Sequence, residues 1–403
     1  GDLGGQVLTI LNVDYLSNRL IQLGESVPNE INSCNVTTSN EFDTQSLFDV
    51  ESLPPDIFVN PGEKVPNRVG FSKYASYLNT IFDKRYGRPL VLAMSADLAD
   101  STNISGFAKE YGSSTDKGLY DKENNLNSPL FPQGITEFTN AGMMAGAATV
   151  NFSNNTYEKF NGFFGAASTY GSFSYLKYGP LRLFSQIAQD SDLKVGKFIW
   201  VVGHSGPETA EDSRTHFGIF APGVTQLFPD GHIINLHPWE HNEVAPCLTS
   251  ALRTDVPIVA IHLTRPPVEI PDRKNLKIAS HLDAGKGAYV IKNYSPKYKK
   301  QGVIIVRGTS STDSIIKLLK KIRNKGPNVK IIAAISWELF KRQTQEYRES
   351  VISTKEWHDA MIITNSSIKL MTNWISNPTV KKYSVSPDFD NKWRTGGSVE
   401  QII

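Results

Sequence analysis

The sequence FIWVVGHSGPETAEDSRTHFG, residues 198–218, joins an apolar run to a polar stretch rich in glycine, histidine and carboxylates. The run FIWVVG is short and continuously apolar, which is typical of a strand buried on both faces of a parallel sheet. The stretch from residue 203 to residue 218 holds two imidazoles and three carboxylates broken by Gly and Pro, so it cannot form a long helix. We therefore expect a loop at the end of a strand, where a rigid frame can hold functional side chains. Its composition alone would equally suit a solvated surface loop.

Similar apolar runs with polar ends lie on both sides of this stretch. They are PLVLAMSADL, HIINLHP and PIVAIHLTR, and they alternate with helical patterns such as SKYASYLNTIF and GITEFTNAGMMAGAATV. Alternating strands and helices predict an α/β fold with a parallel sheet. Because ligands bind beyond the carboxyl ends of the strands in such sheets, the first candidate site residues are those that follow each run: Asp97, Ser101, His204 and Arg265.

A second, smaller α/β unit is predicted from residue 283 onward. GAYVI, GVIIVRGT and VKIIAAIS have the composition of strands, and residues 311–326 have that of an amphipathic helix. We expect this helix to stop near Gly326 and to turn five apolar side chains inward: Ile315, Ile316, Leu318, Leu319 and Ile322. Residues 1–67 show little apolar periodicity apart from a candidate helix at 8–23, and we interpret them as a linker. The predicted domains are therefore 68–282 and 283–403.

Composition and charge argue against several classes of protein. The 403 residues include 42 basic and 40 acidic ones, and a net charge of +2 gives no general electrostatic reason to bind nucleic acid or an anionic membrane. No apolar run could cross a bilayer, no signal peptide is visible, and Cys34 and Cys247 are too few for a disulfide framework or a zinc site. We expect reduced thiols and a cytoplasmic location. Because the chain begins with Gly1, we also expect a processed or clipped chain, or part of a longer product.

The histidines are concentrated in the middle of the chain. None of the eight precedes His204, and five lie between residues 204 and 241. Clustered histidines bind metal or take part in acid–base and phosphate chemistry. The absence of an HExxH spacing makes a metal site the weaker of these two interpretations.

The polar loop at 203–218, called the signature loop below, resembles the transketolase segment THDSIGxGEDGPTH and aligns with it without a gap. His204 takes the place of the first histidine, Glu211-Asp212 that of Glu-Asp, and Thr215-His216 that of the closing Thr-His. Six further stretches resemble family motifs in the same order: SADLADSTN (SADLxxSN), GITEF (GIREH), STYGSF (GTFLNF), LTRPPVEIP (SRQNLP), KGAYVI (KGGYVL) and QEYRESVI (LEYRLSVL). The resemblance runs from Arg68 to the end. It implies a parallel-sheet thiamine-diphosphate-binding (pyrimidine) domain followed by a smaller α/β C-terminal domain.

The resemblance implies a cofactor site with Glu137 at its centre. A carbanion has to form at C2 of the thiazolium ring near neutral pH. A carboxyl group that is hydrogen-bonded to a nitrogen of the aminopyrimidine ring favours the imino tautomer, whose nitrogen removes the C2 proton. Glu137 takes the family position of this carboxyl and forms the implied catalytic pair with His204. Tyr170 and Phe173 match the aromatics that stack on the pyrimidine, and Asp97 completes the implied cofactor-binding residues. Without this context, a lone glutamate is more often an exposed charge, and aromatics at this spacing are more often core.

The implied substrate is a ketose phosphate, which needs readers for its hydroxyls and a clamp for its phosphate. By resemblance, Asp212 would read a hydroxyl and His204 would lie near the reacting oxygen. The phosphate would be held by Arg68, Ser101, His216 and Arg265, of which the guanidinium groups can donate paired hydrogen bonds. Phe138, Ser213 and Arg214 depart from the family motifs, as does HPWEHNE, and they leave the choice of sugar open.

The sequence lacks the GDG…N motif that holds the diphosphate of this cofactor through a divalent ion. In the family that motif belongs to the preceding domain, of which residues 1–67 would be the tail. We therefore predict that this N-terminal half is another chain, either a separate gene product or a cleaved piece, and that it binds the Mg²⁺ or Ca²⁺. The family places the cofactor between protomers, which implies a dimer of halves with four chains in all. No metal ligands are expected in the present chain.

The implied activity is transfer of a two-carbon ketol group from a ketose phosphate to an aldose phosphate, a reaction of the pentose phosphate pathway. The alternatives within the cofactor class are a 1-deoxyxylulose-5-phosphate synthase and a 2-oxoacid dehydrogenase subunit. The phosphate-holding set of Ser101, His216 and Arg265 disfavours the dehydrogenase. A third alternative is a non-catalytic binding subunit, against which the presence of Glu137, His204 and Asp212 argues.

Overall fold

The computed structural model describes residues 3–26, 44–96, 98–112, 118–208, 216, 218–392, 394 and 397. The chain divides into two compact units, residues 1–39 and 40–403. The first contains α1 (Leu3–Ser26), a helix over the region where residues 8–23 predicted one, and its side chains from residue 13 to residue 25 are exposed. None of the described helices is both long and apolar enough to span a membrane.

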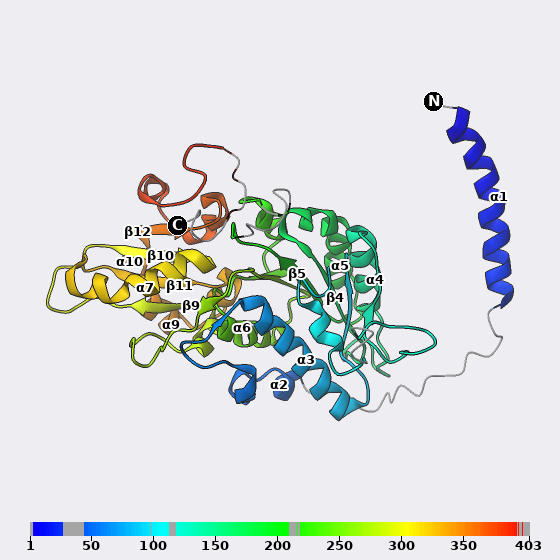
Figure 1. Cartoon of the computed structure of the whole chain (residues 1–403), viewed down its shortest axis with the longest axis horizontal. Coiled ribbons are helices and arrows are strands. Elements are labelled where there is room, and N and C mark those ends of the chain that lie inside the picture. Colours follow the sequence, from blue (N-terminus) through cyan, green and yellow to red (C-terminus); the bar gives the residue numbers. More distant parts are fainter. Residues whose placement is uncertain are drawn as a thin grey trace. The chain divides into compact units, whose positions relative to one another are not determined.

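The larger unit is built on a sheet of six parallel strands in the order β3-β2-β4-β5-β7-β6. Figure 1 labels the neighbouring strands β4 and β5 of this sheet. The strands are β2 (Val91–Ser95), β3 (Leu130–Phe131), β4 (Phe164–Tyr170), β5 (Phe198–Gly203), β6 (Ile233–Leu236) and β7 (Ile258–His262). This sheet confirms the predicted parallel α/β fold. The signature loop follows β5, which is buried along its whole length.

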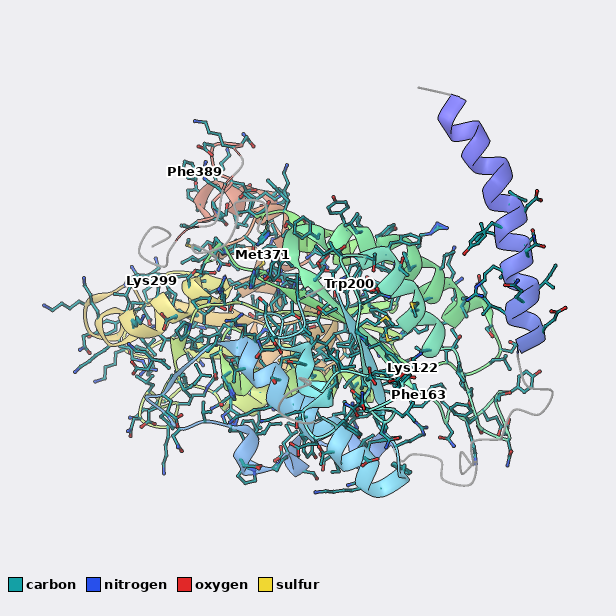
Figure 2. All side chains as sticks on the ribbon, turned by 45° about the vertical axis from the view of Figure 1, so that its right-hand side comes forward. Lys122, Phe163, Trp200, Lys299, Met371 and Phe389 are labelled. Atoms are coloured by element: carbon teal, nitrogen blue, oxygen red, sulfur yellow. The ribbon has the colours of Figure 1, made fainter. Side chains whose placement is uncertain are left out.

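Helices cover both faces of this sheet. Alternate residues of β5 face opposite layers: Ile199 and Val201 belong to one apolar cluster, and Trp200 and Val202 to another. Figure 2 labels Trp200. The first cluster includes side chains of α3 (Asn67–Tyr86) and α6 (His241–Arg253), and the second those of α4 (Glu137–Ala147) and α5 (Tyr178–Asp190). Three 3-10 helices lie in the connections: η3 (Ile104–Ala108), η4 (Gly171–Lys177) and η5 (Ala221–Gln226).

Residues 44–66, which belong to the segment predicted as a linker, pack on this domain. They form α2 (Thr44–Leu47), η1 (Val50–Ser52), η2 (Pro55–Ile57) and β1 (Lys64–Val65), and β1 pairs antiparallel with β8 (Val268–Glu269). Four of their apolar side chains join the main core: Leu47, Phe48, Leu53 and Ile57.

The C-terminal region forms a smaller mixed sheet in the order β12-β10-β11-β9. The strands β10 (Val303–Arg307), β11 (Lys330–Ala334) and β12 (Ala360–Thr364) are parallel, and β9 (Ala288–Lys292) runs antiparallel to β11. The sheet is accompanied by η6 (His281–Lys286), α7 (Thr309–Lys325), α8 (Trp337–Lys341), α9 (Gln345–Val351), α10 (Thr354–His358), η7 (Ile368–Trp374) and η8 (Pro378–Tyr383).

One prediction about α7 is wrong. The helix ends beside Gly326 as expected, and it buries Ile315 and Leu319, but the side chain of Leu318 is 48% exposed. The buried apolar residues of α7, Ile315 and Leu319, are four residues apart and form a narrow stripe along the helix. Leu318 lies at the edge of the apolar face and stays in solvent.

Candidate active site

The site is organised by the carboxyl end of β4. The Thr169 hydroxyl donates a hydrogen bond of 3.0 Å to Oε1 of Glu137, and the Tyr170 hydroxyl shares one of 2.8 Å with that of Ser101. The hydroxyl of Ser168 donates to that of Ser95 at 2.8 Å. Three consecutive residues of one buried strand therefore bond to the end of β2, to the connection that follows it and to the start of α4. The sequence did not single out β4, because FGAASTY is made mostly of small residues and has no apolar run.

Glu137 is the first residue of α4, and its side chain is only 5% exposed. This burial excludes the alternative of an exposed surface charge. Its Oε1 is occupied by Thr169, and the hydrogen bonds of the described residues do not extend to Oε2, which can therefore meet a ligand. A buried carboxyl at the positive end of a helix can hold a hydrogen bond with a ring nitrogen away from water.

Four rings gather at the end of β5. The imidazole of His204 stacks on the ring of Tyr170 at a centroid distance of 3.9 Å and an angle of 17°. The ring of His216 lies 4.7 Å from that of Tyr170 and 5.8 Å from that of Phe173. His204 is 1% exposed and has a positive φ of 51°, a conformation that few non-glycine residues adopt. Both described imidazoles of the signature loop are therefore brought to the two aromatics predicted to flank the cofactor.

Hydrogen bonds connect the segments that carry three of the residues predicted to hold phosphate, Arg68, Ser101 and Arg265. The Arg68 guanidinium donates to the backbone oxygen of Ser101 at 2.8 Å. Asn67, the neighbour of Arg68, accepts a hydrogen bond of 2.8 Å from the backbone N–H of Thr264, the neighbour of Arg265. A pocket of about 340 Å³ opens beside Ser101, and Gln133 is among its lining residues. Asp97 and Asp212 lie outside the described residues, as do Ser213 and Arg214.

The other histidines of the central cluster lie in separate places. His237 stacks on His262 at 4.1 Å, where burial lowers the pKa of both and that of His262 to about 3. His232 bonds to the Ser185 hydroxyl and His241 to its neighbour Asn242. In the described part of the chain, no group of three or more His, Cys, Asp or Glu side chains could hold a metal ion.

Lys177, which the sequence reasoning missed, is buried close to Glu137. Its side chain is fully buried, and Nζ has no hydrogen-bond partner among the described residues. Burial lowers the pKa of the amine well below its ordinary value, and the negative charge of Glu137 acts in the opposite direction. Lys177 ends η4 just before α5, where Gly179 lies against the ring of Phe138. The only sequence signal is a lysine at an inward position of an otherwise apolar segment.

Replacing Lys177 by methionine should stabilise the chain by about 1–3 kcal/mol, because it removes a buried donor that has no partner. Lys197→Met is a matched control, since the buried Lys197 donates to the backbone oxygens of Thr254 and Val256 at 2.6 and 2.9 Å. We expect this control to destabilise the chain. Urea unfolding of the isolated chain measures both effects.

The pH dependence offers a second measure of Lys177. Its pKa is lower in the folded than in the unfolded chain, so unfolding takes up a proton between the two values and stability rises with pH in that window. Lys177→Met should remove this rise. The prediction would be contradicted if the two methionine variants had the same free energy of unfolding. It would also be contradicted if Lys177→Met left the pH dependence of that free energy unchanged.

Models of two known domain families match this chain. The model of the "transketolase, pyrimidine binding domain" matches residues 84–269, and that of the "transketolase-like TK C-terminal domain" matches residues 287–384. The chloroplastic transketolase of Spinacia oleracea is 29% identical over 193 residues, which is 47% of this chain and 24% of the relative. A transketolase of Staphylococcus epidermidis is 25% identical over 267 residues, 66% of this chain and 35% of the relative. The chain thus spans only about a quarter to a third of these relatives.

Solved structures show the same fold. The transketolase of Campylobacter jejuni has a TM-score of 0.63 at 15% identity, over 88% of this chain and 46% of that one. The transketolase of Leishmania mexicana has a TM-score of 0.61 at 16% identity, over 88% and 44%. A protein described as "Split gene transketolase, inactive beta4 tetramer" has a TM-score of 0.50 at 18% identity, over 80% of this chain and 88% of that one.

Proposed function

We propose that this chain, which belongs to the transketolase family and carries its pyrimidine-binding and C-terminal domains, is the catalytic pyrimidine half of a thiamine-diphosphate-dependent transferase. The reaction would move a two-carbon ketol group from a ketose phosphate to an aldose phosphate. The observation that carries this proposal is the buried carboxyl of Glu137, held by Thr169 beside the stacked rings of Tyr170 and His204.

The residues present fit the pyrimidine end of this cofactor. Oε2 of Glu137 accepts no hydrogen bond from the described residues and could meet a ring nitrogen. The rings of Tyr170, which carries His204 on one face, and of Phe173 could line the site of a flat ring. When bound, thiamine diphosphate supplies a nucleophilic carbon and stabilises the carbanion left when a bond next to a carbonyl breaks. Glu137 would hold a proton at the ring nitrogen, and His204 would exchange one with the reacting oxygen of the sugar.

The phosphate of the sugar would be held by residues from separate segments. Arg68 and Arg265 can each donate paired hydrogen bonds to it, and Ser101 and His216 can add single ones. Arg68 already lies beside Ser101, and the Asn67–Thr264 hydrogen bond draws the Arg265 segment toward it. Asp212 would read a hydroxyl. With Asp97 it completes the proposed set.

The diphosphate and its Mg²⁺ or Ca²⁺ would be held by a partner chain. This chain covers 44% and 46% of two solved transketolases, which supports a further region that another chain would supply. The split-gene transketolase, of which this chain covers 88%, is described as an inactive tetramer of one kind of subunit. We infer that the active form has two copies of each half, in the cytoplasm. Native mass spectrometry of the purified complex, followed by an assay of ketol transfer between sugar phosphates, tests this; a single-chain species with full activity would contradict it.

The isolated chain should bind thiamine diphosphate with magnesium at least about 100-fold more weakly than the complex, because several charge-assisted hydrogen bonds of about 1.5–3 kcal/mol each would be missing. Calorimetric titration of the chain alone and with its partner half measures this difference. Tight, magnesium-dependent binding by the isolated chain would overturn the proposed division of the cofactor site.

A further inference from the structure

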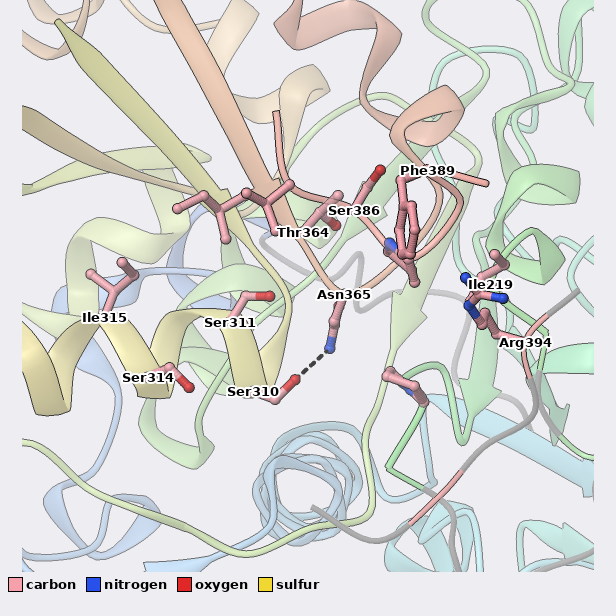
Figure 3. Close-up of a pocket in the computed structure, with 14 residues that line it drawn as sticks. Ile219, Ser310, Ser311, Ser314, Ile315, Thr364, Asn365, Ser386, Phe389 and Arg394 are labelled. Atoms are coloured by element: carbon pink, nitrogen blue, oxygen red, sulfur yellow. Dashed lines mark hydrogen bonds between the residues drawn. The ribbon is translucent and has the colours of Figure 1, made fainter. Parts of the chain in front are cut away.

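The start of α7 lies at the switch point of the C-terminal sheet. The chain passes from β10 to β11 on one side and later returns to β12 on the other, and all three strands are parallel. In open parallel sheets, ligands bind beyond the strand ends at this position. A pocket of about 470 Å³ is found there, between the first turns of α7 and the end of β12, with Phe389 and Arg394 opposite (Figure 3).

The switch point already holds a carboxyl group, and that group belongs to the other domain. Asn365, directly after β12, donates from Nδ2 to Oε1 of Glu208 at 3.0 Å and to the Ser310 hydroxyl at 3.1 Å (Figure 3). Glu208 is part of the signature loop, 157 residues away in sequence. The carboxyl of the loop thus takes the place where such sheets bind an external anion.

The Glu208 carboxyl is buried and accepts a hydrogen bond from the C-terminal domain. The residue is 4% exposed; burial raises the pKa of its carboxyl, and the donors of Ser310 and Asn365 act against this by favouring the charged form. Oε2 is buried and has no hydrogen-bond partner among the described residues. A Cβ atom at Gly206 would come within 2.1 Å of this oxygen, so a side chain there would displace the Glu208 carboxyl.

The same helix start also holds the loop after β7. The Thr309 hydroxyl, in the first turn of α7, bonds to that of Thr264 at 2.8 Å. Thr264 precedes Arg265, which is proposed to bind phosphate. In addition, the backbone N–H of Gly397 donates to the oxygen of Pro207, next to Glu208, at 2.9 Å. The C-terminal domain therefore contacts both loops that carry proposed substrate residues.

We propose that Glu208 is a positioning residue, an internal carboxyl group through which the switch-point site of the C-terminal sheet anchors residues 203–208 and so fixes the imidazole of His204. The anchoring itself stands on the geometry. Its effect on turnover rests on the proposed function.

The anchoring is tested on the isolated chain by hydrogen exchange. Glu208→Ala should speed the exchange of the described amides of residues 203–208 by at least about tenfold, the factor that corresponds to 1.4 kcal/mol of local stability. Glu208→Gln keeps one acceptor and should have a smaller effect, and Asn365→Ala should resemble Glu208→Ala. The matched control is Glu338→Ala, because Glu338 also bridges the two domains by accepting hydrogen bonds of 3.2 Å from Asn235. Exchange in Glu208→Ala equal to that in Glu338→Ala would overturn the proposal.

The catalytic consequence is tested on the assembled complex. Glu208→Ala should lower kcat/KM by about 10- to 100-fold through displaced loop residues, with the larger part in the KM for sugar phosphate, whereas Glu338→Ala should leave it near the wild-type value. A complex whose turnover is insensitive to Glu137 would refute the proposed function while leaving the exchange result intact. Faster loop exchange together with wild-type kinetics would show that the loop is anchored without being positioned for catalysis, and would overturn the proposed role.

Discussion

Glu137→Gln should lower the turnover of the assembled complex by at least about 100-fold, the usual contribution of a general acid–base group. Glutamine keeps the shape of the side chain and an oxygen that can still accept the hydrogen bond from Thr169. What it loses is the exchange of a proton with the cofactor ring. Steady-state kinetics should show the fall in kcat, and calorimetry should show that the cofactor still binds. This combination would assign the loss to chemistry and not to folding.

Two further variants provide a smaller expected loss and a control without one. Thr169→Val removes the hydroxyl that orients Glu137 and should give a smaller loss, since the carboxyl itself remains. Glu158→Gln changes an exposed glutamate and should leave turnover unchanged. Unchanged turnover in Glu137→Gln would favour a non-catalytic binding subunit, the alternative that the sequence left open.

Arg273→Met should destabilise the chain by about 3–5 kcal/mol, the usual cost of leaving buried charges without their partner. Nη2 of Arg273 lies 2.8 Å from a carboxylate oxygen of Glu240 and 2.8 Å from one of Glu243. Both glutamates are fully buried, and the hydroxyl of Tyr289 in β9 also donates to Glu243. Removing one guanidinium would therefore strand two carboxylates at the junction of the two domains. Urea unfolding at neutral pH measures the loss.

The loss should depend on pH. Burial, reinforced by the charge of Glu243, raises the pKa of Glu240 to about 7 despite the nearby Arg273. The folded chain therefore binds more protons than the unfolded chain between the ordinary pKa of a glutamate and about 7, and stability falls as pH rises through this window. Arg273→Met should cost less at acid pH, where the carboxylates are neutral.

A surface pair supplies the control for Arg273. Arg342 lies 3.2 Å from Asp255, with 41% and 87% of the two side chains exposed. Arg342→Met should change stability by no more than about 1 kcal/mol, because water screens exposed pairs. Similar losses in both arginine variants would contradict the view that Arg273 stabilises the domain junction through buried charges.

Much of the fold could be predicted from short apolar runs. The runs at β2, β5, β6 and β7 are continuous, which is the pattern of strands covered on both faces, and a parallel sheet follows from their alternation with helices. The strand β4, which is rich in small residues, was not predicted from apolar runs. It lies between β2 and β5 and carries Thr169, which bonds to Glu137, and Tyr170, which bonds to Ser101. Apolar content signals burial, but it cannot signal a strand whose small side chains let helices approach closely. The same limit explains Leu318, since the width of a buried stripe depends on what packs against it.

Resemblance to family motifs, and not residue type alone, selects Glu137 and the histidines of the signature loop as candidates for chemistry, and the place of Arg265 after an apolar run adds to its case. Only the tertiary structure decided which of them meet. Thr169 reaches Glu137 across 32 residues, and Asn365 reaches Glu208 across 157. Neither contact has a spacing that could be read in advance, because it depends on the order of strands in a sheet, which is set by how all the layers bury their apolar faces together. Lys177 belongs with them, since only the packed structure shows a buried amine that has no partner among the described residues.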